Sequence, residues 1–226
     1  MIHAALFALL LSAPPAGTAG LYFEQTTVVR PGGEAAGPGV RSRVWHAERR
    51  LRLEAGDEPG GPALVLRLDE GRALRLDPEA RVAVELDVTR LRARSHQDAS
   101  VAGSFLGEAL RPAPLEGRRT IAGHACRGFR LRGRQASVDV WVAEDLPAGA
   151  AAFADFLEWS GADQALGGLV AAIRELPGFP LETRTRVCVL GETHETVATV
   201  TAVRAGPQPP ELFEVPAGWR LEREKP

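Results

Sequence analysis

The sequence predicts a mainly β protein of the α+β class, in which one curved antiparallel sheet, or half-open β-barrel, wraps around three short helices. Several short segments carry apolar residues at every second position, and turns rich in Asp, Glu, Gly and Pro separate them. This pattern is typical of half-buried strands joined as hairpins. Three other segments carry apolar residues at helical spacing. A sheet with one apolar face needs such helices to cover it.

Residues 1–19 are expected to be a signal peptide. An apolar run from Ala4 to Leu11 is followed by Ser-Ala-Pro-Pro, and small residues end at Ala19. The run is too short to span a bilayer, which needs about 20 apolar residues. No cysteine follows it to accept a lipid anchor, and no later stretch is long and apolar enough to cross a membrane. We therefore expect a periplasmic or secreted protein that is not membrane-spanning, with a single domain over residues 20–226.

The first half of the chain predicts an antiparallel meander. Residues 21–29 are expected to form a strand, and the Pro/Gly-rich residues 30–39 a loop. Three alternating segments follow, and their opposite faces are polar, so one side of the sheet should face solvent. The in-phase apolar residues are Trp45, Ala47, Leu51 and Leu53, then Leu64, Leu66 and Leu68, then Val82, Val84, Leu86 and Val88.

The second half mixes helices with hairpins. The polar residues 89–97 predict a loop, after which Asp98 is the expected N-cap of a first helix that ends before Pro112. Hairpins are expected to turn at Gly133 and Gly191. Between them, a helical insertion carries two apolar stripes, and near the end of the chain three apolar residues are expected to pack on the core. These residues are Phe153, Phe156 and Leu157, then Leu166, Leu169, Val170 and Ile173, and finally Phe213, Val215 and Trp219.

The order of these elements resembles the LolA/LolB-like superfamily, the carrier and acceptor of outer-membrane lipoproteins. The segments that carry the resemblance are "ERRLRLEAG", "LRLDEGRALRLDPEARVAVEL", "TIAGHACRGFRL", "VDVWVAEDLP", "GFPLETRTRV" and "ELFEVPAGW". The last four of these segments, from "TIAGHACRGFRL" onward, together look like an uncharacterised bacterial family of exported proteins near that superfamily. The resemblance implies a half-open barrel capped by helices, with an apolar cavity that binds acyl chains.

We therefore expect a non-enzymatic protein that binds an acyl chain, lipid or lipoprotein between the sheet and the helices. The alternative is an envelope interaction or sensory module with a packed core, which would use its convex face or Trp141. The candidate apolar lining consists of Trp45, Leu53, Leu66, Val84, Leu86, Phe129, Val140 and Phe156.

Other classes of function lack support. The net charge is −2, and the arginines do not cluster with aromatic residues, so nucleic-acid binding is not expected. The sequence has no Gly-x-Ser-x-Gly elbow, no Gly-rich phosphate loop and no His-Glu-x-x-His motif. We expect no cofactor, and a monomer.

The two cysteines invite three interpretations. An exported chain with two cysteines usually pairs them, and strand parity places Cys126 and Cys188 on polar faces, so a disulfide is the favoured prediction. The alternative is two separate thiols with a strand between them. A metal site formed by both cysteines with His124 and His194 is a third hypothesis, although the spacing does not match that of structural zinc sites.

Overall fold

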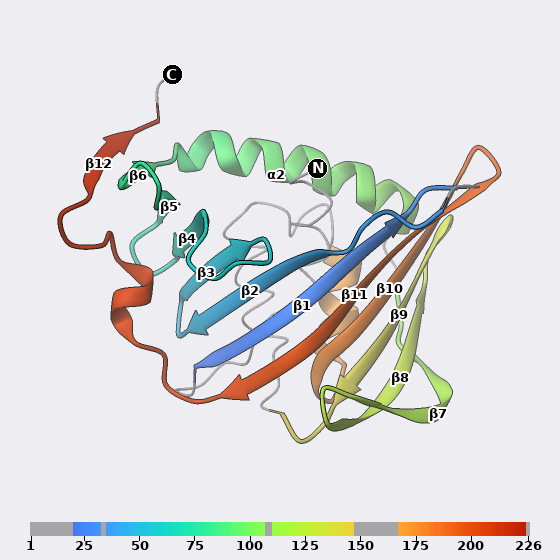
Figure 1. The fold of residues 1–226 in the computed structure, drawn as a ribbon. Helices are drawn as coiled ribbons and strands as arrows, with labels where there is room; N and C mark the ends of the chain where they lie inside the picture. Colours follow the sequence, from blue (N-terminus) through green and yellow to red (C-terminus); the bar gives the residue numbers. More distant parts are fainter. Residues whose placement is uncertain (1–19, 33–34, 107–109, 147–166, 225–226) are drawn as a thin grey trace.

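The computed structural model describes residues 20–32, 35–106, 110–146 and 167–224. Its described strands form one curved sheet in the order β12-β6-β5-β4-β3-β2-β1-β11-β10-β9-β8-β7 (Figure 1). All neighbours are antiparallel except β12 and β6, which run parallel. The sheet is not closed, since β7 and β12 end it. The predicted fold class is confirmed.

The strands are β1 (Leu21–Arg30), β2 (Val40–Ala47), β3 (Arg50–Ala55), β4 (Ala63–Arg67), β5 (Arg72–Asp77), β6 (Val82–Glu85), β7 (Ala113–Ile121), β8 (His124–Arg132), β9 (Ala136–Ala143), β10 (Phe179–Val189), β11 (Glu192–Ala205) and β12 (Arg220–Arg223). The helices are α2 (Val88–Leu106), α4 (Gly167–Arg174) and the 3-10 helix η1 (Pro210–Phe213). The predicted hairpins at Gly133 and Gly191 are confirmed.

The register defines an inner and an outer face of the sheet. Val140 packs with the residues of α4, which lies behind β10 and β11 in Figure 1, inside the curl of the sheet. Side chains of cross-strand partners lie on the same face of a sheet. Val140 pairs with Thr183, and Thr183 is linked through β11 to Thr27 on β1, so all three lie on this face. It continues through β2 to Leu53 on β3. We call this the inner face and its opposite the outer face.

Two hydrophobic clusters seal opposite faces of the sheet. In the α4 half, which comprises β8–β10 and α4, the inner face is sealed by Leu169, Val170 and Ile173, as their stripe predicted. In the tail half, which comprises β2–β6 and residues 210–219, the outer face is sealed by the chain's C-terminal segment. There Phe213 is fully buried, and Trp219 packs against the same cluster, so the predicted docking of the tail is confirmed.

The segment from Trp45 to Leu53 is a hairpin rather than one strand. A two-residue turn joins β2 to β3, so partners on the two strands have numbers of opposite parity. Trp45 therefore pairs with Arg52 and faces outward, whereas Leu53 pairs with Val44 and faces inward. The prediction that Trp45 and Leu53 share a face is wrong because the sequence carries no glycine to mark this turn.

The first helix begins about ten residues earlier than predicted. Residues 89–97 are helical, and the N-cap is Asp87, whose Oδ1 accepts a hydrogen bond of 3.1 Å from the backbone N–H of Arg90. Most side chains of this first part are exposed, and α2 runs along the rim of the sheet in Figure 1. A helix that buries so little shows no apolar stripe, which is why its sequence resembles a loop.

Candidate ligand-binding face

The inner face of the tail half carries apolar side chains that the described chain covers only in part. Leu53 and Leu64 are cross-strand partners on β3 and β4, and Leu64 is linked to Val84 on β6 through Arg75 of β5, an exposed side chain on the same face. The leucine and valine side chains are half-buried, whereas the core of the α4 half is sealed. We call this set the inner leucine face, and it consists of Leu51, Leu53, Leu64, Leu68, Val84 and Leu86. Leu51 and Leu53 pack at the margin of a third buried cluster, which includes Phe23 and Val44.

Not all predicted lining residues belong to this face. Leu53, Val84 and Leu86 do, and Leu66 shares their side of the sheet but is only 2% exposed. Phe129 and Val140 pack against α4 instead. Trp45 faces outward, and Phe156 lies outside the described residues. The prediction that these side chains contact a ligand stays a prediction.

A row of buried polar side chains adjoins the inner leucine face and was missed by sequence reasoning. His46 pairs with Leu51 and is 5% exposed, and within the described chain its Nδ1 has no hydrogen-bond partner. Burial lowers the pKa of His46 to about 4, so the ring is neutral at pH 7. Ser42 and Thr27 are equally enclosed on the same face. Their burial could not be predicted from the sequence, because single polar residues in a strand are usually placed on its solvent-exposed face.

The predicted disulfide is wrong, because both cysteines are free thiols. Cys126 lies opposite Ala143 at one end of β9, whereas the backbone N–H of Cys188 donates a 2.8 Å hydrogen bond to Gln135 at the other end. Eight residues of strand, or about 26 Å, separate those positions, and a disulfide needs Cα atoms within about 7 Å. Burial raises the pKa of the Cys126 thiol, so it behaves as a small apolar core residue.

The hypothesis of a metal site formed by the cysteines and histidines is also contradicted. Nδ1 of His124 lies 2.8 Å from a carboxylate oxygen of Asp145, at the same end of the sheet as Cys126. His194 pairs with Val187 on the inner face, whereas Cys188 is on the outer face. Within the described ranges, no group of three or more His, Cys, Asp or Glu side chains is placed to hold a metal ion.

Trp141 lies on the outer face, as its phase predicted, but it is only 6% exposed. Its ring lies across Gly128, its partner on β8, and the guanidinium of Arg119 lies 4.2 Å from the ring centre. The indole is therefore covered by the protein itself and offers little surface to a partner.

Comparison with known proteins assigns no activity to this chain. A family model described as a domain of unknown function (DUF4412) matches residues 113–219, just under half of the chain. No curated protein matches the sequence. None of the helices that the structure describes is long and apolar enough to cross a membrane.

Solved structures with a similar arrangement share little sequence with this chain. An uncharacterized conserved protein from Thermus thermophilus is 12% identical with a TM-score of 0.44, and 92% of each chain is covered. The LolA superfamily protein NE2245 from Nitrosomonas europaea is 11% identical with a TM-score of 0.37, and the match covers 93% of this chain and 97% of that one. PNGF-II is 14% identical with a TM-score of 0.38; the match covers 91% of this chain, which spans only 31% of the length of PNGF-II.

A LolA superfamily protein, from the superfamily that the sequence resembles, is thus among the similar structures. All these identities are 14% or lower and the TM-scores are below 0.5. Nothing about a ligand, a partner or an activity of this chain follows from these similarities.

Proposed function

We propose that this protein is a non-enzymatic carrier, periplasmic or secreted, that binds an acyl chain or another apolar ligand against the inner leucine face. The observation that carries the proposal is that the described residues cover this face only in part. Soluble proteins bury leucine and valine rows of this kind or use them to bind, because each buried Å² of apolar surface is worth about 25 cal/mol. Six half-buried side chains on the concave side of one sheet form a surface of that kind.

The face also suggests how a ligand would be oriented. His46 is the cross-strand neighbour of Leu51, and its neutral ring presents Nδ1 without a hydrogen-bond partner in the described chain. A buried polar atom of this kind costs about 1–3 kcal/mol unless it is satisfied. A ligand with an apolar chain and one hydrogen-bonding end would cover the inner leucine face with its chain and would give Nδ1 of His46 a hydrogen-bond partner. An amphiphile such as a fatty acid or the acylated end of a lipopeptide has that chemistry.

Uptake of a fluorescent fatty acid by delipidated protein tests the proposal. Leu64→Arg places a second guanidinium beside Arg75, the cross-strand partner of Leu64, and is expected to weaken binding at least about tenfold, because an apolar ligand would then have to desolvate both charges. Leu190→Arg is the matched control: it is the same substitution at a fully exposed position, and it should leave binding unchanged.

Two results would contradict the proposal. One is the absence of any uptake by the folded, delipidated protein. The other is equal uptake by the Leu64→Arg and Leu190→Arg variants. Either result would favour the alternative, an interaction or sensory module with a packed core.

A further inference from the structure

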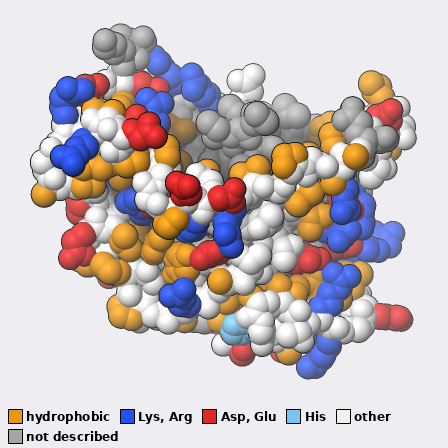
Figure 2. Space-filling view, in the orientation of Figure 1, with side chains coloured by type: hydrophobic (Ala, Val, Ile, Leu, Met, Phe, Trp, Pro, Cys, Tyr) orange, Lys and Arg blue, Asp and Glu red, His pale blue; other side chains and the backbone are white. Residues whose placement is uncertain are grey.

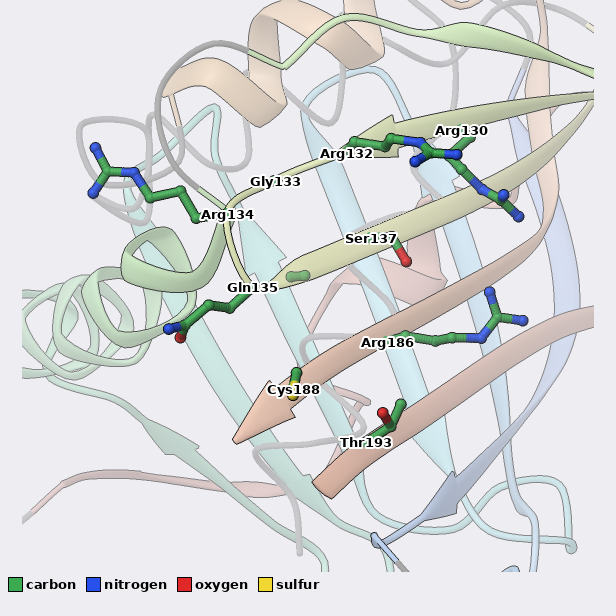
Figure 3. Close-up of a pocket in the computed structure, with 10 residues that line it drawn as sticks. Arg130, Arg132, Gly133, Arg134, Gln135, Ser137, Arg186, Cys188 and Thr193 are labelled. Atoms are coloured by element: carbon green, nitrogen blue, oxygen red, sulfur yellow. The ribbon is translucent and has the colours of Figure 1, made fainter. Parts of the chain in front are cut away.

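The outer face of the α4 half has a separate hollow that the apolar-ligand proposal does not use. It has a volume of about 450 Å³ and lies over the ends of β8, β9 and β10, next to the turn that joins β8 to β9 (Figure 3). Four of its lining residues are arginines, and none is acidic. The lining consists of Arg130, Arg132, Gly133, Arg134, Gln135, Ala136, Ser137, Arg186, Cys188 and Thr193.

Cross-strand register brings two of these arginines to either side of a hydroxyl group. Arg132 on β8 and Arg186 on β10 are both Cα partners of Ser137 on β9. Neighbouring strands are about 4.8 Å apart, so the two arginine Cα atoms are about 10 Å apart with the serine between them. In Figure 3, Arg130, Arg132 and Arg186 extend to the same side, whereas Arg134 and Gln135 extend the opposite way.

The positive charge of this group is only partly balanced. Arg130 and Arg186 both reach Asp139, at 2.5 and 3.2 Å, and Arg186 also lies 2.9 Å from Glu195. Within the described chain, neither Arg132 nor Arg134 has an ion-pair partner, although Figure 2 shows acidic and basic side chains interleaved over the neighbouring strands. The hollow is therefore locally cationic in a chain whose net charge is −2.

The backbone around the hollow is held in place before any ligand binds. The N–H groups of Arg134 and Gln135 donate hydrogen bonds of 3.3 and 2.9 Å to the last carbonyls of α2, at Leu106 and Phe105. A Cβ atom at Gly133 would overlap the backbone of Leu106, so only glycine permits this close approach. The backbone of this turn therefore needs no rearrangement to present its side chains to a ligand.

We propose that this hollow binds the phosphate group of a small phosphorylated ligand or of a lipid headgroup. Guanidinium groups make paired, charge-assisted hydrogen bonds to phosphate oxygens, and a tetrahedral anion can be shared by donors that approach from several directions. Arg132 is the primary contact because its charge is unpaired. Arg130, Arg186 and the Ser137 hydroxyl complete the donor set.

Cys188 supplies a reporter at the site. It is exposed in the lining of the hollow, while Cys126 is buried, so a thiol reagent should react with Cys188 first. Bound phosphate should slow the reaction of Cys188 with the neutral reagent N-ethylmaleimide, and the effect should saturate with phosphate concentration. Chloride at matched ionic strength should not reproduce it.

Two charge-matched variants localise the effect. Arg132→Gln should raise the half-saturating concentration of inorganic phosphate about tenfold, as expected for the loss of a charge-assisted hydrogen-bond pair. Arg118→Gln removes the same charge from an exposed position on β7, outside the lining of the hollow, so it should change that concentration less than about twofold. Absence of saturable protection, or equal shifts in both variants, would overturn the proposal.

Vesicles distinguish the two sources of phosphate. Sedimentation with phosphatidylcholine vesicles, with and without phosphatidic acid, separates a headgroup from a free anion. Binding that requires phosphatidic acid and Arg132 assigns the site to a lipid headgroup. Protection by inorganic phosphate without vesicle binding assigns it to a small soluble phosphate. The Leu64→Arg variant should behave as wild type in both assays, so this site and the apolar site can fail independently.

Discussion

The two halves of the sheet bury opposite faces. In the α4 half, a helix seals the inner face, and the outer face carries charged residues such as Arg130 and Asp139. In the tail half, Phe213 and its neighbours seal the outer face, and the inner face carries half-buried leucines. One continuous sheet therefore has a charged surface at one end and, at the other, an apolar surface that the described residues cover only in part. A ligand that prefers apolar contacts and one that prefers charge would meet different halves of the same molecule.

The largest expected effect compares the two inner faces directly. Leu131 is 0% exposed beneath the α4 half's helices, so Leu131→Ala should lower the free energy of unfolding by about 2–5 kcal/mol. Leu64→Ala, on the half-buried inner leucine face, should cost only about 1 kcal/mol. Urea denaturation of both variants measures the difference. Equal losses would show that the inner face of the tail half is as tightly packed as that of the α4 half, which would contradict the proposed difference between the two halves.

The halves should also respond to different ranges of pH. His46, on the inner face of the tail half, has its pKa lowered from 6.5 to about 4 by burial. The unfolded chain therefore binds a proton between pH 6.5 and 4 while the folded chain does not, so stability falls as pH falls through that range. The loss approaches about 3 kcal/mol. His46→Leu should flatten the stability curve over this window, as measured by urea denaturation at several pH values. A curve unchanged by the substitution would contradict the lowered pKa.

Charge pairing on the outer face of the α4 half should have a smaller effect. Burial raises the pKa of Asp139, but ion pairs with Arg130 and Arg186 outweigh it and hold the pKa below its usual value. This stabilisation is present above the unfolded pKa and is lost as pH falls through the lower folded pKa, which is a more acidic window than that of His46.

At pH 7, Asp139→Asn should therefore cost about 1–2 kcal/mol, since two guanidinium groups lose their shared acceptor. Glu222→Gln in the exposed Arg220–Glu222 pair is the control and should change stability by less than about 0.5 kcal/mol. Comparable losses in the two variants would mean that the outer network contributes no more than an ordinary surface pair.

The sequence predicted what depends on local periodicity. The alternation of Leu64 with Leu66, or of Val138 with Val140, reports which side chains share a face, and the structure places them accordingly. The face of Trp45 was predicted wrongly because residues 45–53 alternate as one strand would, although a two-residue turn without glycine divides them into two. Across that turn, odd-numbered residues of one strand pair with even-numbered residues of the other.

Features set by distant pairing were beyond this reasoning. The separation of Cys126 from Cys188 depends on β9 lying between β8 and β10, and on the register along it. The arginines of the outer hollow come from two strands and a turn, and nothing in the local pattern of Arg132 or Arg186 indicates that they flank the same serine. Local pattern gives the face of a residue, whereas register gives its neighbours.

The smallest expected effect lies outside the buried clusters, at the tip of the β10–β11 hairpin. Leu190 is 100% exposed with a φ of 53°, and Gly191 follows with a φ of 86°, so the two form a turn in which both central residues are left-handed. Asn adopts this conformation more readily than Leu, so Leu190→Asn should raise the free energy of unfolding by about 0.5–1 kcal/mol. Because the tip contacts neither the inner leucine face nor the arginine hollow, the gain should appear in urea denaturation without any change in fatty-acid uptake or in phosphate protection of Cys188. A change in either binding assay would mean that the hairpin tip is coupled to that half, and that the two surfaces are not set by the buried clusters alone.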